Sequence, residues 1–191
     1  MKKILIIMII AAALLSVQSL SAEGPKIEKA IIAYKVTSTD QEYMGNGTME
    51  IAYDNFGKYM ATTSITGEMN VTTIISPEGD YMINWNDKTG MDLSAFGDMK
   101  EDGFDFEKDD EGEKIGTETI LGKNCEIRLY KDEYGWEKLW LWQGVPLKVV
   151  SDSEGIVTTM EATAVSTPAS IPPSKFKVPA GIEILKMPGL N

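Results

Sequence analysis

Apolar residues recur at every second position along most of this chain, and this alternation constrains its fold more than any other feature. Met49, Ile51 and Tyr53, for example, alternate with Thr48 and Glu50. A period of two is typical of a β-strand with one buried face, whereas the spacing of an amphipathic helix is hardly visible. The chain is therefore predicted to be mainly β.

Ten such runs follow one another, separated by turn residues such as Gly, Asn, Asp and Pro. The runs are residues 27–37, 48–53, 58–66, 69–75, 81–85, 118–121, 125–131, 137–142, 147–151 and 156–165. Short strands in close succession predict an up-and-down antiparallel sheet of about nine or ten strands. A sheet this wide curls because each strand twists against its neighbour, so we expect an incomplete β-barrel.

The alternation breaks in residues 92–113, which contain ten acidic residues and only two basic ones, Lys100 and Lys108. Four apolar residues are interleaved with them: Phe96, Met99, Phe104 and Phe106. Runs of charge usually face water, so a solvated loop is one interpretation. The other is a lid of short helix and loop whose aromatic side chains dip into a cavity.

The two ends of the chain are distinct from its middle. Lys2 and Lys3 precede an apolar run that ends at Leu15, and a more polar stretch follows as far as Ala22, which is the layout of a secretory signal peptide. The run is too short to span a bilayer, which takes about 20 apolar residues. Residues 1–22 are thus predicted to be cleaved, leaving one β domain, residues 23–191, in the periplasm or outside the cell. Cleavage after Ser21 is the alternative.

No cysteine stands at the new N-terminus, so lipidation is not expected, and no integral membrane segment remains after cleavage. The one cysteine, Cys125, excludes an internal disulfide and is in phase with Ile127 and Leu129, which predicts a small buried residue. The tail, residues 167–191, is rich in Pro and is expected to be an extended closing segment. Its apolar anchors would be Phe176, Val178, Ile182 and Ile184.

Charge and composition narrow the classes of function. Without Lys2 and Lys3 the chain has 16 basic and 29 acidic residues, a net charge of −13 that disfavours binding to nucleic acid or to anionic headgroups. The chain has no His, so a hydrolytic triad of the usual kind is impossible and Cys125 has no imidazole to activate it. We therefore expect no catalytic residues and no cofactor. No metal is expected either, because the match of Glu107, Asp109 and Glu111 to a calcium loop is poor.

Residues 136–142 suggest what the chain binds. Leu139 and Leu141 point to one side of the strand, and Trp140 and Trp142 to the other, so both sides must be covered. The cover is either core packing, an apolar ligand in a concave cavity, or a partner. Methionine side chains adapt to ligands of variable shape. The nine in the mature chain are Met44, Met49, Met60, Met69, Met82, Met91, Met99, Met160 and Met187.

Three segments carry a resemblance to a known group of proteins. They are residues 118–126, 139–148 and 172–181, which read ETILGKNCE, LWLWQGVPLK and PPSKFKVPAG. Here the chain resembles a large group of uncharacterised bacterial envelope proteins, which is similar to the LolA-like superfamily of lipoprotein carriers. The resemblance implies a curved sheet whose concave apolar side is partly closed by a lid and holds acyl chains. Those carriers keep an Arg on the cavity wall, whereas alternation turns Arg128 toward water, opposite Cys125 and Leu129.

The sequence therefore predicts a non-enzymatic periplasmic binding protein or carrier for an apolar ligand, such as a lipid or an acyl chain. The predicted ligand-binding residues are Trp140, Trp142, Trp85, Phe96, Met99, Phe104 and Phe106. The alternative is a cell-envelope module that docks a protein partner without a small ligand.

Overall fold

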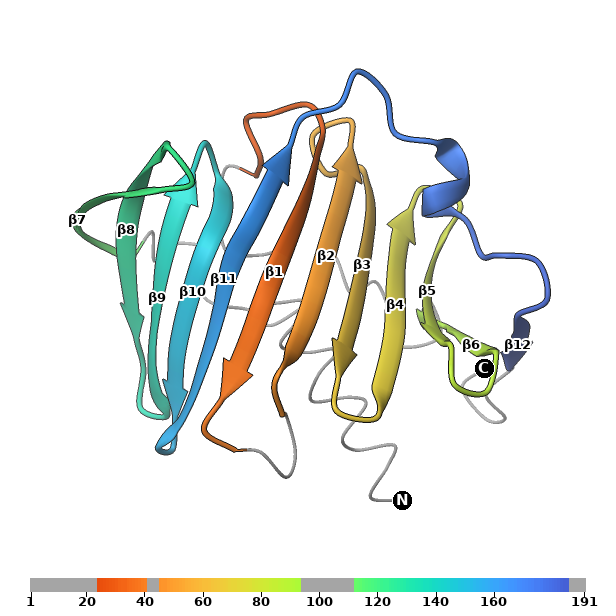
Figure 1. Ribbon diagram of the computed structural model, residues 1–191, viewed down its shortest axis with the longest axis horizontal. Coiled ribbons are helices and arrows are strands. Elements are labelled where there is room, and N and C mark those ends of the chain that lie inside the picture. Colours follow the sequence, from red (N-terminus) through yellow and green to blue (C-terminus); the bar gives the residue numbers. More distant parts are fainter. Residues whose placement is uncertain (1–23, 41–44, 94–111, 186–191) are drawn as a thin grey trace.

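The computed structural model describes residues 24–40, 45–93 and 112–185, and its strands form one curved antiparallel sheet (Figure 1). Six strands come from the first half of the chain: β1 (Ala30–Ser38), β2 (Gly47–Asp54), β3 (Tyr59–Thr66), β4 (Met69–Ser76), β5 (Gly79–Asn84) and β6 (Thr89–Asp92). The others are β7 (Glu113–Ile120), β8 (Lys123–Lys131), β9 (Gly135–Trp142), β10 (Val145–Ser153), β11 (Ile156–Ser166) and β12 (Glu183–Leu185).

The predicted fold class is confirmed, with two more strands than expected. All ten runs of alternating residues are strands, and the sheet has 12 because β6 and β12 are added. Both are short, at four and three residues, so neither contains enough alternation to be recognised in the sequence. They pair with each other in parallel, which is the one parallel pair in a sheet otherwise antiparallel among the described strands.

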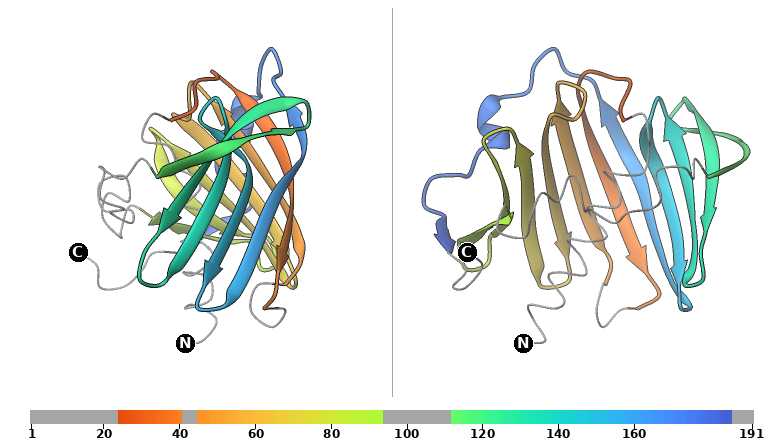
Figure 2. Two further views of the ribbon diagram at one scale, coloured as in Figure 1. Left: turned by 90° about the vertical axis from the view of Figure 1, so that its left-hand side faces the viewer. Right: turned by 180° about the vertical axis from the view of Figure 1, so that it is seen from behind.

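The order of the strands shows where the barrel stays open. Two meanders, β1–β6 and β7–β11, join through the antiparallel pair of β1 and β11, so the order is β12-β6-β5-β4-β3-β2-β1-β11-β10-β9-β8-β7. The first and last long strands therefore meet, as in a closed up-and-down barrel. The free edges are β12 and β7, and the sheet bends between them without closing (Figure 2).

The buried apolar side chains of the sheet form two clusters. Strand partners share a face, so the registers assign every strand residue to one side or the other. Ile32 and Ile51 belong to the larger cluster, on the concave side, whereas their neighbours Ile31 and Ala52 belong to a smaller cluster on the convex side. We call these sides the inner face and the outer face.

The closing segment covers part of the outer face. Residues 173–176 form a short 3-10 helix beside β3 and β4, and Phe176 is buried with Ala61 and Ile74. The Phe176 ring lies 5.9 Å from the ring of Tyr59. An ion pair of 2.7 Å between Lys175 Nζ and Glu50 Oε1 adds a polar contact at the same place. Apolar anchors in the tail thus bury the outer face of strands that would otherwise be exposed to solvent on that side.

The predicted burial of Cys125 is also confirmed, since its side chain is fully buried. Burial raises the pKa of its thiol above the ordinary value, which makes the thiolate scarce and the group unreactive. Within the described part of the chain no helix is long and apolar enough to cross a membrane.

Candidate functional site

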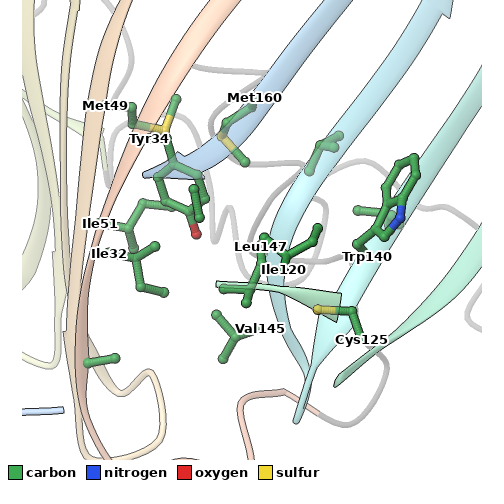
Figure 3. Close-up of a cluster of buried hydrophobic side chains, with 14 of the residues drawn as sticks. Ile32, Tyr34, Met49, Ile51, Ile120, Cys125, Trp140, Val145, Leu147 and Met160 are labelled. Carbon is green, nitrogen blue, oxygen red and sulfur yellow. The ribbon is translucent and has the colours of Figure 1, made fainter. Parts of the chain in front are cut away.

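The inner face is the candidate ligand surface, and its centre is apolar. Side chains from β1 and β2 point toward side chains from β10 across the hollow of the sheet (Figure 3). Ile32, Tyr34 and Leu147 are at most 1 % exposed. Tyr34 faces Ala162 on β11, and because alanine is short the Tyr34 ring reaches β10, where its hydroxyl donates a 2.8 Å hydrogen bond to the carbonyl oxygen of Pro146.

The methionines are the feature that distinguishes the inner face. Six of the nine in the predicted mature chain lie in described strands, and every one of the six is on the inner face by register. They are Met49, Met60, Met69, Met82, Met91 and Met160. Met49 and Met160 are buried in the central cluster, whereas the other four, on β3 to β6, are half-buried. One arm of the curved sheet therefore presents flexible thioether side chains to whatever lies in the hollow.

Hydroxyl groups accompany the methionines on this arm. Thr62, Ser64 and Thr73 are buried on the inner face of β3 and β4, and Tyr53 lies beside them on β2. Burial raises the pKa of Tyr53 to about 12, so its hydroxyl stays neutral at any physiological pH. The arm thus combines apolar surface with uncharged hydrogen-bonding groups.

The other end of the inner face is charged. Arg128 is opposite Cys125 and Leu129, as predicted, but it pairs with Leu139 and so lies on the inner face, with 26 % of its side chain exposed. Its expected direction toward bulk water is therefore wrong. Its Nε donates a 2.6 Å hydrogen bond to Glu126. Contacts from Lys114 and then from Arg128 hold the pKa of Glu126 below its usual range.

Glu137 lies on the same end of the inner face. It pairs with Tyr130 on β8 and with Ser151 on β10. Burial raises its pKa to about 7, well above the range of an ordinary glutamate, so its carboxyl group is only partly ionised at neutral pH. A carboxyl group poised near neutrality is a common feature of functional sites and also of strained structural positions.

By register the predicted tryptophans of β9 lie on the outer face, although they pack with the same buried cluster as Leu139 (Figure 3). Trp140 pairs with Ile127 and Lys148 there, is 8 % exposed, and donates a 2.6 Å hydrogen bond from Nε1 to Glu118. Trp142 lies two residues further along the same face, with Lys123 Nζ 4.4 Å from its ring centroid. Leu139 and Trp140 are thus both buried, which confirms that this strand is covered on its two sides.

The structure does not bring all the predicted site residues together. Trp85 follows β5 in the opposite arm of the sheet, is 38 % exposed, and donates a 2.8 Å hydrogen bond from Nε1 to Thr72. Six strands separate β5 from β9 in the sheet. Four predicted residues lie outside the described part of the chain: Phe96, Met99, Phe104 and Phe106.

No pattern in the sequence predicted Tyr53, Thr73 or Glu137 as residues of a functional site. Tyrosine and threonine are ordinary strand residues, and whether their hydroxyls find partners depends on how the side chains pack in the folded sheet. In the described ranges no group of three potential ligands from His, Cys, Asp and Glu is placed to hold a metal ion.

These features define a class of protein: an open, strongly curved antiparallel sheet with a methionine-lined inner face. The chain belongs to the family described as "Domain of unknown function (DUF4412)", whose model matches residues 29–145. No curated protein matches it.

A solved structure shares the fold, and others resemble it less closely. An uncharacterized conserved protein from Thermus thermophilus is 7 % identical with a TM-score of 0.61, and the match covers 92 % of this chain and 98 % of that one. The LolA superfamily protein NE2245 from Nitrosomonas europaea is 9 % identical with a TM-score of 0.44, over 85 % of this chain and 96 % of that one.

Proposed function

We propose that this protein is a non-enzymatic binding protein or carrier that holds an apolar ligand, such as a lipid or an acyl chain, on its inner face. The observation that supports it is the gathering of all six described methionines on that face. Met60, Met69, Met82 and Met91 are only half-buried there, on the same face as the larger apolar cluster.

Methionine suits such a surface for a physical reason. Its unbranched thioether chain has several rotatable bonds and a polarizable sulfur, so it adapts to ligands of different shape with little strain. A structural core that specified one packing would favour branched residues instead, as the centre of this cluster does with Ile32, Ile51 and Leu147. The arm from β3 to β6 therefore has the composition of an adaptable binding surface.

The place of action is part of the same proposal. Residues 1–22 have the layout of a signal peptide and would direct the chain to the periplasm or out of the cell. An apolar ligand has to cross an aqueous space there, and a soluble acidic carrier would keep it out of water.

The roles of Trp140, Trp142 and Trp85 in binding stay predictions. Their outer-face positions also suit the alternative function, docking of an envelope protein. One observation favours that alternative: Lys123 Nζ lies 4.4 Å from the ring centroid of Trp142, which is half-buried at the end of β9. A cationic and aromatic patch on an acidic protein could recognise an acidic partner.

Native mass spectrometry of the mature protein, purified from its own envelope, tests the proposal. Organic extraction of whatever stays bound then identifies the ligand class. We expect a stoichiometric apolar adduct that raises the unfolding temperature. A ligand-free mass, with no stabilisation by lipids or detergents, would contradict the carrier function and favour a protein partner.

A pair of variants locates the binding surface. Met82→Glu places a charge on the half-buried inner face of β5 and should abolish the adduct, because a buried unpaired carboxylate repels apolar ligands. Ile65→Glu is the matched control, since Ile65 is 47 % exposed on the outer face of β3. It should bind as the wild type does. Equal loss in both variants would place the ligand elsewhere.

A further inference from the structure

Two buried hydroxyl groups on the inner face have no hydrogen-bond partner among the described residues. They are the hydroxyls of Tyr53, which is 2 % exposed, and Thr73, which is 4 % exposed. Buried polar groups are almost always hydrogen-bonded, and those that are not call for an explanation. Tyr34, on the same face, follows the rule through its bond to Pro146.

Both groups lie on the methionine-lined arm. Tyr53 pairs with Met60, and Thr73 pairs with Thr62 and with Met82. The two residues are two strands apart in the sheet and one inner-face position apart along it, so their Cα atoms are separated by about 12 Å. A headgroup that carries several oxygens could span this separation and reach both hydroxyls.

The charge of the surroundings limits which headgroup fits. Strands β2 to β5, all of whose residues the structure describes, contain no Lys and no Arg. A carboxylate or phosphate buried there would have no cation to offset its lost hydration. The ligand group facing Tyr53 and Thr73 should therefore be uncharged. The only inner-face charge on these four strands is the acidic Asp80, at the start of β5.

We propose that Tyr53 and Thr73 form a polar subsite that selects an uncharged oxygen-bearing headgroup, such as the ester and hydroxyl oxygens of a neutral acyl glyceride. The inference rests on the proposed function and names the substrate class of the same site. The acyl chain lies against the half-buried methionines of β3 to β6, and the headgroup oxygens complete the hydrogen bonding of the two hydroxyls.

Displacement of a fluorescent apolar probe by three ligands of similar chain length tests the subsite. Monodecanoylglycerol has an uncharged headgroup, decanoate has a carboxylate, and undecane has no headgroup. The wild-type protein should bind monodecanoylglycerol most tightly. Tyr53→Phe removes only a hydroxyl, and Thr73→Val replaces a hydroxyl by a methyl group. Each should weaken the binding of monodecanoylglycerol by about three- to tenfold and leave the binding of undecane unchanged.

The same variants give a second readout without ligand. Because the two hydroxyls are unpartnered, their removal should leave the unfolding temperature of the free protein unchanged or raised. Tyr34→Phe is the matched control: it should lower the unfolding temperature while preserving the preference for monodecanoylglycerol over undecane.

The outcomes separate the two levels of the proposal. If undecane binds as tightly as monodecanoylglycerol, the subsite is refuted while the binding function stands. The same holds if both variants weaken the binding of the two ligands equally. A loss of unfolding temperature in Tyr53→Phe and Thr73→Val like that of Tyr34→Phe would also refute it, because the hydroxyls would then have partners. If none of the three ligands displaces the probe, the carrier function itself fails.

Discussion

The Tyr34 hydroxyl on β1 donates its hydrogen bond to the Pro146 carbonyl oxygen on β10, across the whole width of β11. The bond is buried and joins residues 112 positions apart in the sequence. It connects the two meanders on their inner face, next to the strand pair that joins them through the backbone. The short side chain of Ala162 on the intervening strand leaves room for it.

Tyr34→Phe should therefore destabilise the fold by about 1–3 kcal/mol, because the buried Pro146 carbonyl loses a donor. Urea denaturation measures this as a lower midpoint at an unchanged slope. An unchanged midpoint would mean that the bond contributes nothing and that the meanders are held by apolar packing and strand pairing alone.

Phe176→Ala should lower the free energy of unfolding by about 3–5 kcal/mol, since it removes the main buried anchor of the closing segment and leaves a cavity against Ala61 and Ile74. Lys175→Ala, one residue earlier, removes only the exposed ion pair to Glu50 and should cost less than about 1 kcal/mol. Denaturation of the two variants compares them directly. Similar losses would show that the ion pair, rather than burial, holds the tail.

Trp140→Phe should destabilise the protein by about 1–3 kcal/mol, because the Glu118 carboxylate loses a short hydrogen bond from the indole. A double-mutant cycle with Glu118→Ala, which removes the acceptor, isolates the pair, and we expect a positive coupling energy. A coupling of zero would indicate that Trp140 is held by packing and by the lysine contacts only.

The stability of the protein should fall as the pH rises from about 5 to about 8. The pKa of Glu137 is raised to about 7 by burial, whereas a glutamate in an unfolded chain ionises near pH 4.3, so the folded state binds the extra proton in this window. The chain has no His, which leaves few other side chains to titrate there.

Glu137→Gln should flatten this profile and make the protein more stable than the wild type at pH 8 by about 2 kcal/mol. Thermal denaturation across the pH range measures it. Glu133→Gln is the control, because Glu133 is exposed in the turn before β9 and should not change the profile. A wild-type profile that is already flat would show that Glu137 is hydrated in the folded state.

Local patterns were sufficient to predict the long strands. The alternation of Met49, Ile51 and Tyr53 with polar residues predicts a strand with one buried side. These three residues are buried in the structure. The sequence also predicted that Leu139 and Trp140 are both covered and that Phe176 anchors the tail. In each case a large apolar side chain predicts burial, and all three residues are buried. Short elements such as β6 and β12 were missed, since three or four residues contain too little periodicity.

The candidate site was predicted less well than the fold. Trp140 was identified because its strand is apolar on both sides, yet by register it lies on the face opposite the methionines. Alternation assigns residues to two sides of a strand, but it does not say which side becomes concave. Arg128 shows the same limit: its side of the strand was correct and its environment was not.

What the sequence determined by itself is the set of strands, the two-sided burial of β9 and the apolar anchors of the tail. Each follows from side-chain hydrophobicity within a few neighbouring residues. The tertiary structure decided that β1 pairs with β11, that the barrel opens between β12 and β7, and that six methionines share the hollow with two unpartnered hydroxyls. The pairing of β1 with β11 joins residues more than a hundred positions apart, and the direction of curvature is a property of the whole sheet and not of any one strand.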